Sequence, residues 1–331
     1  MKRILVLSDG RPGHYNQSLA VADAVEEIES AEVRVMEVKV KKSTKYLLRM
    51  MLNSNIGRKW LQQVMRPEMI SWFYDGYVYE EKPDIVISSG KDTSMLNALL
   101  GLMYGVKTLF IGNPKKLDHR LFTAVLTLID LGFDNQVVLD IAPTRRYRGD
   151  IETFCKEHRL DPHATYYTLL IGGDGSGYRY SEKEYEKLID LVNHTKEDVK
   201  WLVTTSRRTP LEMEMQMQKK MNTAMFVAYN QKPQKVIGAF LALSDVVFVT
   251  EESASMVSEA VASGKKVVTL VPEVVVLDKN YGKILNKFED EEKIKRVQCA
   301  DIGGSDKIDI DMEYSDQNHI LQNFLYRFLK V

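Results

Sequence analysis

Short runs of β-branched and other apolar residues alternate with longer amphipathic stretches along almost the whole chain, and this alternation restricts the fold more than any other feature. Continuous apolar runs are typical of strands in a parallel sheet, because helices cover both of its faces. The pattern therefore predicts an α/β fold with mainly parallel sheets. The strands expected in the first half are Ile4–Leu7, Val33–Val38, Ile85–Ser88, Thr108–Ile111, Val125–Leu128 and Val137–Leu139.

The same alternation starts again after a polar, arginine-rich stretch between residues 143 and 165. A chain of 331 residues has room for two domains that each bury a core of their own. We therefore expect two successive doubly wound units, followed by an amphipathic terminal helix that packs back on one of them. The strands expected in the second unit are Tyr167–Ile171, Val199–Thr204, Met225–Ala228, Val246–Thr250 and Lys266–Leu270.

Composition excludes several classes of protein. The formal net charge is −1, so nothing in the overall charge favours a nucleic-acid partner, and we expect none. Cys155 and Cys299 lie far apart and match no metal or redox spacing. The apolar run Ile4–Leu7 is too short for the core of a signal peptide or for a membrane span. These features predict a protein of the reducing cytoplasm.

The first candidate functional loop follows the first predicted strand and reads Ser-Asp-Gly-Arg-Pro-Gly-His at residues 8–14. In doubly wound sheets, ligands bind beyond the carboxyl ends of the strands. Asp9, Arg11 and His14 offer a base, a cation and a titratable imidazole on one tight loop, which Gly13 helps to shape. A structural turn with His14 as a helix cap is the alternative, but three ionisable groups on one such loop favour function.

Two loops of the second half have the composition of phosphate-binding sites. Residues 172–177 read Gly-Gly-Asp-Gly-Ser-Gly, and such a loop can form a concave set of backbone N–H groups; no Lys-Ser/Thr follows, so it is not a Walker loop. In the second loop, Ser206 and Arg207 stand before a proline-started helix, and a guanidinium recognises phosphate oxygens in a bidentate manner. The neighbouring Arg208 is as compatible with a surface turn as with function.

The last candidate loop runs from Thr250 to Ala260, again from a strand into a helix. Ser253 and Ser255 mark the expected helix start, where free N–H groups can face a pyrophosphate. Glu259 lies further along roughly the same helix face and can accept hydrogen bonds from ribose hydroxyls. Glu251 and Glu252 are either part of this site or only complement the helix dipole.

A basic amphipathic segment at residues 39–66 differs in kind from these loops. It contains eight basic residues and no acidic one, interleaved with apolar residues that include Tyr46, Met50 and Trp60. Such a segment can lie on an anionic membrane or receive a lipid-linked acceptor. A helix with an ordinary buried face and solvated lysines explains it equally well.

The four loops together resemble the mitochondrial-fission-protein-like family, from about residue 3 to about residue 272. The motifs that carry the resemblance are SDGRPGHYNQS at 8–18, the Gly-Gly-Asp loop, TTSRRTP at 204–210 and TEESASMVSEA at 250–260. Bacterial members of that family are regarded as glycosyltransferases of the GT-B type. A looser similarity links the loop ending at Gly13-His14 to the lipid-acceptor N-acetylglucosaminyltransferase of peptidoglycan synthesis.

This resemblance implies two Rossmann-like domains with a ligand cleft between them. Residues 1–145 then form the acceptor domain, 146–165 a linker, 166–312 the nucleotide-sugar domain and 313–331 the helix that packs back. Glu251 and Glu259 have the E-x7-E spacing of some retaining GT-B enzymes, in which the second carboxylate binds ribose, so Glu259 is the safer assignment. The only D-x-D, at Asp309–Asp311, lies near the C-terminus in an acidic context and not at a strand end, which predicts metal-independent chemistry.

We therefore expect a glycosyltransferase that uses a nucleotide-sugar as co-substrate and no other cofactor. The expected acceptor is a glycan or a lipid-linked molecule. For residues 39–66, contact with the inner face of an anionic membrane and an ordinary solvated helix face stay open as alternatives. A nucleotide-sugar 2-epimerase of the same fold and a non-catalytic adaptor are the alternatives. The expected catalytic residues are His14 and Asp9; the donor-binding residues are Gly172, Gly173, Asp174, Gly175, Ser206, Arg207, Glu251, Glu252, Ser253, Ser255 and Glu259; and the acceptor-binding residues are Arg11, Gly13 and Asn16.

Overall fold

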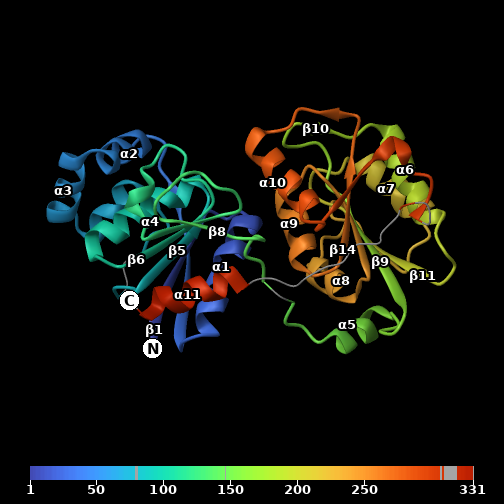
Figure 1. Cartoon of the computed structure of the whole chain (residues 1–331), viewed down its shortest axis with the longest axis horizontal. Helices are drawn as coiled ribbons and strands as arrows, with labels where there is room; N and C mark the ends of the chain where they lie inside the picture. Colours follow the sequence, from blue (N-terminus) through green and yellow to red (C-terminus); the bar gives the residue numbers. More distant parts are fainter. Residues whose placement is uncertain (79–80, 146, 306–307, 309–318, 331) are drawn as a thin grey trace. The chain divides into compact units, whose positions relative to one another are not determined.

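A computed structural model describes residues 1–78, 81–145, 147–305, 308 and 319–330 (Figure 1). The chain divides into two compact units, Met1–Arg145 with Gln317–Val331 and Arg146–Asp316. Each unit contains one six-stranded sheet in which all neighbouring strands are parallel. The predicted fold class is confirmed.

The sheet of the first unit has the strand order β2-β1-β5-β6-β7-β8. The chain passes from β1 to β2 on one side and later continues from β5 on the other side of β1. The strand order therefore reverses between β1 and β5, and this switch point is where doubly wound sheets bind ligands. The strands are β1 (Lys2–Ser8), β2 (Ala31–Glu37), β5 (Ile85–Ser89), β6 (Lys107–Ile111), β7 (Ala124–Thr127) and β8 (Gln136–Val138).

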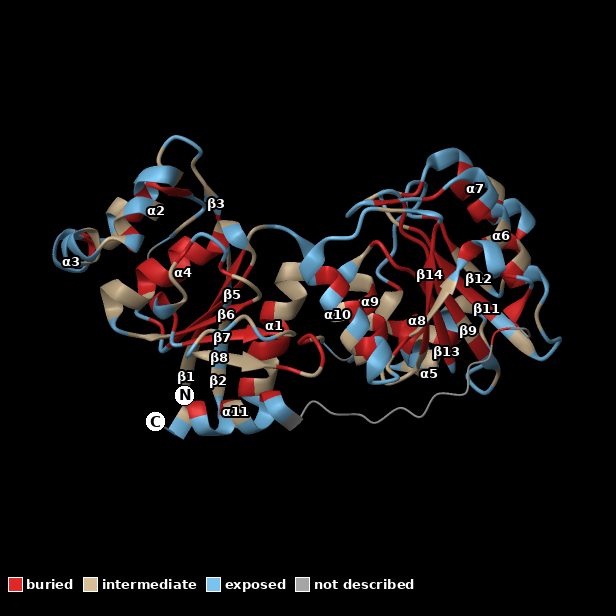
Figure 2. Cartoon of the chain, turned by 45° about the horizontal axis from the view of Figure 1, so that its top comes forward, coloured by how far each residue is buried: buried red, intermediate tan, exposed pale blue. Residues whose placement is uncertain are grey.

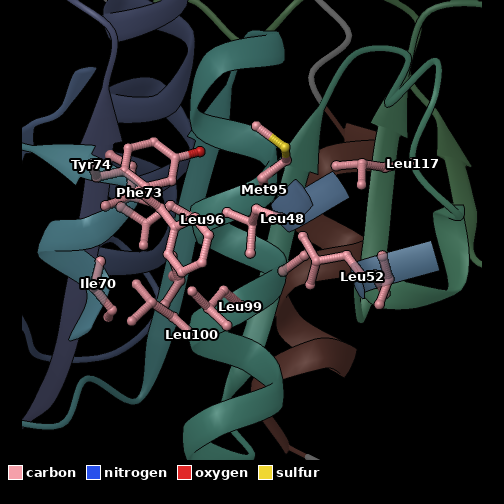
Figure 3. Packing of buried hydrophobic residues seen from close by; sticks show 14 of the residues in the cluster. Leu48, Leu52, Ile70, Phe73, Tyr74, Met95, Leu96, Leu99, Leu100 and Leu117 are labelled. Carbon is pink, nitrogen blue, oxygen red and sulfur yellow. The ribbon is translucent and has the colours of Figure 1, made fainter. Parts of the chain in front are cut away.

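Helices cover both faces of this sheet, as the continuous apolar strands require. Ile4 and Val6 point into a core shared with α1 and α11, whereas Leu5 and Leu7 point into a core shared with α2 and α4. Figure 3 shows the second core, where side chains of α2 and α4 interlock. The helices are α1 (Pro12–Glu26), α2 (Lys45–Asn53), α3 (Asn55–Val64), α4 (Lys91–Tyr104) and α11 (His319–Lys330), with the short elements η1 (Pro67–Trp72), η2 (His119–Leu121), β3 (Lys39–Val40) and β4 (Tyr74–Asp75).

Helix α11 belongs to the first unit although it follows the whole second unit in the sequence. Its Leu321, Leu325 and Phe328 recur at helical spacing and are buried in the core beside Ile4 and Val6. Residues 309–318, which include Asp309 and Asp311, lie outside the described residues.

The sheet of the second unit has the strand order β12-β11-β9-β13-β14-β16, with its switch point between β9 and β13. Its strands are largely buried, whereas the outer faces of the surrounding helices are exposed (Figure 2). The strands are β9 (Thr165–Leu170), β11 (Val199–Thr204), β12 (Met225–Val227), β13 (Val246–Thr250), β14 (Lys266–Val271) and β16 (Lys295–Gln298), with a separate antiparallel pair, β10 (Tyr178–Arg179) and β15 (Val274–Val275).

Helix α5 lies within the range 146–165 that was expected to be a linker. Asp150 caps its start, and its Phe154 packs against Phe240 in the core of the second unit. The helices of this unit are α5 (Ile151–His158), α6 (Glu182–Asn193), α7 (Leu211–Lys220), α8 (Ile237–Leu243), α9 (Ala254–Ala262) and α10 (Lys279–Asp290), with the short helix η3 (Cys299–Asp301).

Candidate functional site

An aspartate and a histidine meet at the switch point of the first sheet. Asp9 follows β1 directly, and His14 lies in the first turn of α1. The Oδ2 atom of Asp9 lies 2.9 Å from Nδ1 of His14, and its Oδ1 atom accepts a hydrogen bond from the backbone N–H of Arg11 at 3.2 Å. The side chain of Asp9 is only 4% exposed, whereas that of His14 is 31% exposed. The imidazole therefore stands between a buried carboxylate and the surface.

This hydrogen bond decides which nitrogen of His14 can react. An aspartate carboxylate only accepts hydrogen bonds, so Nδ1 of the neutral imidazole carries the proton and Nε2 has a free lone pair. A histidine held in this way can take a proton from a hydroxyl, and the carboxylate then stabilises the imidazolium that forms. Asp9 and His14, both predicted to be catalytic, thus have the geometry of a general base and its orienting partner.

Gly90 is a member of this site that the sequence did not reveal. It lies between β5 and α4 with φ +91°, a conformation that L side chains rarely adopt. A Cβ atom at this position would collide with Nδ1 of His14 and lie 3.0 Å from Oδ2 of Asp9. The only sequence signal is a glycine at the carboxyl end of a strand, directly before a helix.

The three residues expected to bind the acceptor surround the start of α1. Arg11 is its exposed N-cap residue, with Nε 3.9 Å from Oδ2 of Asp9. Gly13 and Asn16 lie in the first turns of the helix and are partly exposed. The structure thus brings them to the same loop as His14, and their contact with an acceptor stays a prediction.

Glu252 forms the centre of the switch point of the second sheet, directly under the glycine loop. Its Oε1 atom accepts hydrogen bonds from the N–H of Gly173 at 3.2 Å and from Nη2 of Arg208 at 2.8 Å. A Cβ atom on Gly172 would collide with the same carboxylate. Gly172 is therefore needed because the carboxylate of Glu252 occupies the space that a side chain would take.

The Glu252 carboxylate has no contact with solvent. Burial raises its pKa to about 7, although the neighbouring Arg208 guanidinium acts in the opposite direction. Its Oε2 atom has no hydrogen-bond partner among the described residues. Arg208, which the sequence left open between function and a surface turn, is turned inward as the partner of Glu252.

The glycine loop, residues 172–177, was predicted to turn its backbone N–H groups toward a phosphate, but some of these groups bond to other parts of the protein. The N–H of Gly173 is bonded to Glu252, and the N–H of Gly175 is bonded to the carbonyl oxygen of Tyr178 in a tight reverse turn. Asp174 accepts a hydrogen bond from the N–H of Tyr180 and is otherwise exposed. Two of the amides predicted to face a phosphate are thus occupied by protein groups.

Glu251 also has its oxygens occupied. Arg296 binds both of them, at 2.8 and 2.7 Å, while Tyr178 donates to Oε1 and Thr269 to Oε2. The Glu251 side chain is fully buried. Instead of facing a ligand, as the sequence suggested, it joins β10, β14 and β16 to the end of β13.

The start of α9 remains open to a ligand. Ser253 is its N-cap residue, yet its hydroxyl makes no capping hydrogen bond, and the first turn carries no acidic residue. The N–H groups of the first helical turn have no acceptor within the helix. Ser253, Ser255 and Glu259 are all partly exposed, and Glu259 follows Ser255 by one turn on the same helix face. Their predicted grouping on one helix face is compatible with the structure.

The two arginines after β11 have opposite orientations. Arg208 points inward, whereas Arg207 is exposed and makes no ion pair with any described residue. Ser206 accepts a hydrogen bond from the N–H of Arg208 at 3.1 Å, which holds this turn in shape. Arg207 is therefore the cation of this loop that is free to meet an anion.

Comparison with protein families establishes what kind of chain carries these loops. The model of the family described as mitochondrial fission ELM1 matches residues 12–301. The chain belongs to the mitochondrial fission ELM1 family. The matched range includes His14, the glycine loop and α9. Among curated proteins, none matches this ELM1 family chain in sequence.

Solved structures that are similar to this ELM1 family chain include an epimerase, a UDP-bound plant protein and a heptosyltransferase. UDP-GlcNAc 2-epimerase from Methanocaldococcus jannaschii is 12% identical with a TM-score of 0.53, over 100% of this chain and 99% of that one. The Arabidopsis thaliana protein UGT89C1, complexed with UDP, is 11% identical with a TM-score of 0.51, over 99% and 90%. The E. coli ADP-heptose LPS heptosyltransferase II is 15% identical with a TM-score of 0.48, over the whole of both chains. The first two likenesses show that the fold is of the GT-B type.

The described residues of this ELM1 family chain contain no group of three or more His, Cys, Asp or Glu side chains arranged to hold a metal ion. Within the same ranges, each helix is too short or too polar to cross a bilayer.

Proposed function

We propose that this chain is a glycosyltransferase that moves a sugar from a nucleotide-sugar donor to a hydroxyl group of a glycan or lipid-linked acceptor. The observation that carries the proposal is the Asp9–His14 pair, with Nε2 of His14 unbonded to Asp9 at the switch point of the first sheet. The GT-B type of fold supports the same conclusion.

In the proposed reaction His14 is the catalytic base. Its Nε2 atom takes the proton of the acceptor hydroxyl while the acceptor oxygen bonds to the anomeric carbon of the sugar. The bond between that carbon and the phosphate oxygen breaks, and its electron pair leaves with the nucleoside diphosphate. Asp9 is a positioning residue that orients the imidazole, and Arg11, Gly13 and Asn16 contact the acceptor.

In the second unit, the start of α9 holds the diphosphate of the donor. Helix N–H groups and the hydroxyls of Ser253 and Ser255 bind its oxygens, assisted by Ser206 and Arg207. These groups stabilise the charge that develops on the leaving group. Glu259 accepts hydrogen bonds from the ribose hydroxyls.

The remaining expected donor residues have a supporting role in this proposal. Glu251 and Glu252 are saturated with protein contacts or buried, so they shape the loops rather than touch the donor. Gly172, Gly173, Asp174 and Gly175 complete the wall above Glu252. Only the outer surface of this loop is then available to the donor sugar.

The first test is a thermal-shift screen with UDP, GDP, ADP, CMP and their sugars, with and without Mg²⁺. A ligand at about 100 times its Kd adds about 2.7 kcal/mol to the free energy of unfolding. We expect a metal-independent shift with one nucleoside diphosphate, and a clearly smaller shift in Arg207→Ala and in Glu259→Ala. The exposed positions Lys219→Ala and Glu186→Ala in the same unit are the controls. If none of these nucleotides raises the melting temperature, the chain is not a transferase of this kind.

The second test separates transfer from epimerisation, for which a solved structure of the same fold exists. The donor is incubated with the protein alone and with a panel of glycan and lipid-linked acceptors. Transfer requires the acceptor and yields a nucleoside diphosphate together with a glycosylated product. An epimerised nucleotide-sugar formed from the donor alone would replace the transferase proposal with an epimerase.

A further inference from the structure

The helix pair α2 and α3 presents apolar side chains to solvent on its outer side. Ile56 is 83% exposed, Tyr46 68% and Met50 64%. We define the α2–α3 surface as the exposed residues Tyr46, Leu47 and Met50 of α2 and Ile56, Trp60 and Val64 of α3. Met50 follows Tyr46 and Leu47 by four and three residues, and Ile56, Trp60 and Val64 recur every four residues, so each set lies on one face of its helix.

These residues are distinct from the side of the helices that packs on the core. Leu48 and Leu52 of α2 and Leu61 of α3 are completely buried, and the two leucines of α2 interlock with α4 in Figure 3. Each helix thus has one apolar face that stabilises the unit and a second one that does not. Core packing therefore explains only the buried half of the amphipathic pattern.

The segment that carries the α2–α3 surface is positively charged. Residues 39–66 include eight basic side chains and no acidic one. Lys41, Lys45 and Arg58 pair with aspartates elsewhere in the unit. The other five make no ion pair with a described residue, and they are Lys39, Lys42, Arg49, Lys59 and Arg66.

The helix pair is held firmly, so the surface is a fixed feature of the unit. A Cβ atom on Gly57 would collide with the carbonyl oxygen of Met51, which shows how closely α3 approaches α2. Arg58 donates from Nε to the carbonyl oxygen of Leu52 at 2.6 Å and from Nη2 to Asp118 at 2.7 Å. These bonds connect both helices to the body of the first unit.

We propose that the α2–α3 surface docks on the surface of an anionic lipid bilayer. Aromatic rings and aliphatic side chains next to unpaired cations fit the boundary between headgroups and acyl chains. Anionic headgroups supply the negative charge that the segment itself lacks. With nine and ten residues, the two helices are too short to span a bilayer, so they lie along it.

Docking at this place has a consequence for the candidate site, which rests on the proposed function. Lys45, at the start of α2, donates to Asp92 in the first turn of α4 at 2.7 Å. The same turn of α4 follows Gly90, which packs against His14 and Asp9. The membrane-facing helices thus adjoin the loop that carries the proposed base, and a lipid-linked acceptor reaches this loop from the bilayer.

The test measures binding of the full chain to vesicles of phosphatidylcholine with 30% phosphatidylglycerol by flotation, with pure phosphatidylcholine vesicles alongside. The variant Lys42→Gln/Ile56→Ser/Lys59→Gln/Trp60→Ser removes two cations and two apolar side chains from the surface. Leu211→Ser/Met215→Ser/Lys219→Gln/Lys220→Gln makes the same changes at exposed positions of α7. No nucleotide is added, so the result does not depend on the proposed reaction.

We expect the unsubstituted chain to bind the anionic vesicles, more weakly at high salt, and the neutral vesicles poorly. Loss of two cations alone should weaken binding about 25-fold, at about fivefold for each cation, and loss of the apolar contacts should weaken it further. The α7 variant should bind like the unsubstituted chain. Absence of binding, unchanged binding of the α2–α3 variant, or an equal loss in the α7 variant would overturn the docking proposal. A nucleotide thermal shift that persists in the α2–α3 variant would show that the proposed donor site does not depend on the α2–α3 surface.

Discussion

The two switch points lie at equivalent places in two similar sheets, yet they use charge in opposite ways. At the first, a single buried carboxylate orients an imidazole that is 31% exposed. At the second, the two adjacent carboxylates of Glu251 and Glu252 are completely buried and bound by Arg296 and Arg208. The first arrangement leaves the imidazole partly exposed, whereas the second turns its charges into the protein.

Under the proposed function, this difference corresponds to a different task for each unit. A base must be able to exchange its proton with a substrate, so it cannot be enclosed. A site that holds a diphosphate gains from rigid loops that do not reorganise when charge develops. Under the proposed function, the same topology supplies a reactive group in one unit and a stiff binding frame in the other.

The largest expected effect comes from removing the base of the first switch point. His14→Ala should lower the rate of transfer by about 10² to 10⁴-fold, or about 3 to 5 kcal/mol in activation free energy, because proton transfer from the acceptor is lost. The nucleotide thermal shift should not change. His163→Ala, at an exposed position of the second unit, is the control. Transfer at the unsubstituted rate would remove His14 from the mechanism.

The second prediction concerns the buried charge of the second switch point. The pKa of Glu252 is about 7 in the folded chain against an ordinary value of 4.5, so the folded state holds a proton that the unfolded state has lost between these two values. The contribution of this group to the free energy of unfolding is fully present below pH 4.5 and is lost as the pH rises through 7. The total loss is about 3 kcal/mol, at 1.36 kcal/mol for each pKa unit.

Glu252→Gln should abolish this fall, because the amide stays neutral and still offers an oxygen to Gly173 and Arg208. The measurement is the free energy of unfolding of both proteins in urea between pH 4.5 and 8. The difference between them should grow with pH in favour of the variant. A difference that stays constant over this range would mean that Glu252 is already ionised in the folded chain at pH 4.5.

The third prediction tests whether the space at Gly90 matters to the base. Gly90→Ala should displace the His14 ring and lower transfer about 100-fold, the cost of a misplacement of about 1 Å. Gly105→Ala is the matched control, because Gly105 ends the same helix with φ +62° and a Cβ atom there meets nothing within 4 Å. Both variants should lose stability, as measured by Tm, but only Gly90→Ala should lose activity beyond that. If Gly90→Ala and Gly105→Ala have equal activity, Gly90 does not contribute to the site.

The smallest expected effect is that of the exposed cation in the second unit. Arg207→Ala should weaken binding of the nucleoside diphosphate about tenfold, since one charged hydrogen bond contributes about 1.5 kcal/mol. Isothermal titration calorimetry measures the Kd. Because Arg207 pairs with no described residue, the Tm of the free protein should not change. A tenfold loss accompanied by a lower Tm would point to a structural role instead.

The sequence predicted the central strands well because they are continuous apolar runs that both faces of a sheet must bury. β16 escaped prediction because Lys295–Gln298 is short, mostly polar and lies at the sheet edge. Helix α5 was hidden in the polar stretch 146–165, where the few apolar residues include Ile151, Phe154, Cys155 and Leu160. Elements at a sheet edge or on the surface show little of the periodic pattern of apolar residues on which such predictions depend.

The candidate site was predictable at the level of loops but not of individual contacts. Loops at strand ends could be read from the chain, and they placed His14 and Asp9 together. The direction of a side chain could not be read in the same way. Glu251 turns toward Arg296, which is 45 residues away in the sequence, and Arg208 turns inward while Arg207 does not. Such choices depend on distant partners.

Helix α11 has a consequence for how the molecule is made. During synthesis on a ribosome, residues 146–316 emerge before residues 319–330, and they contain all six strands of the second sheet. The core on the face of the first sheet that carries Ile4 and Val6 is complete only when α11 has packed on it, although the strands of that sheet are synthesised first. The domain that is translated first is thus the last to be complete, and its nascent form exposes an apolar face to chaperones.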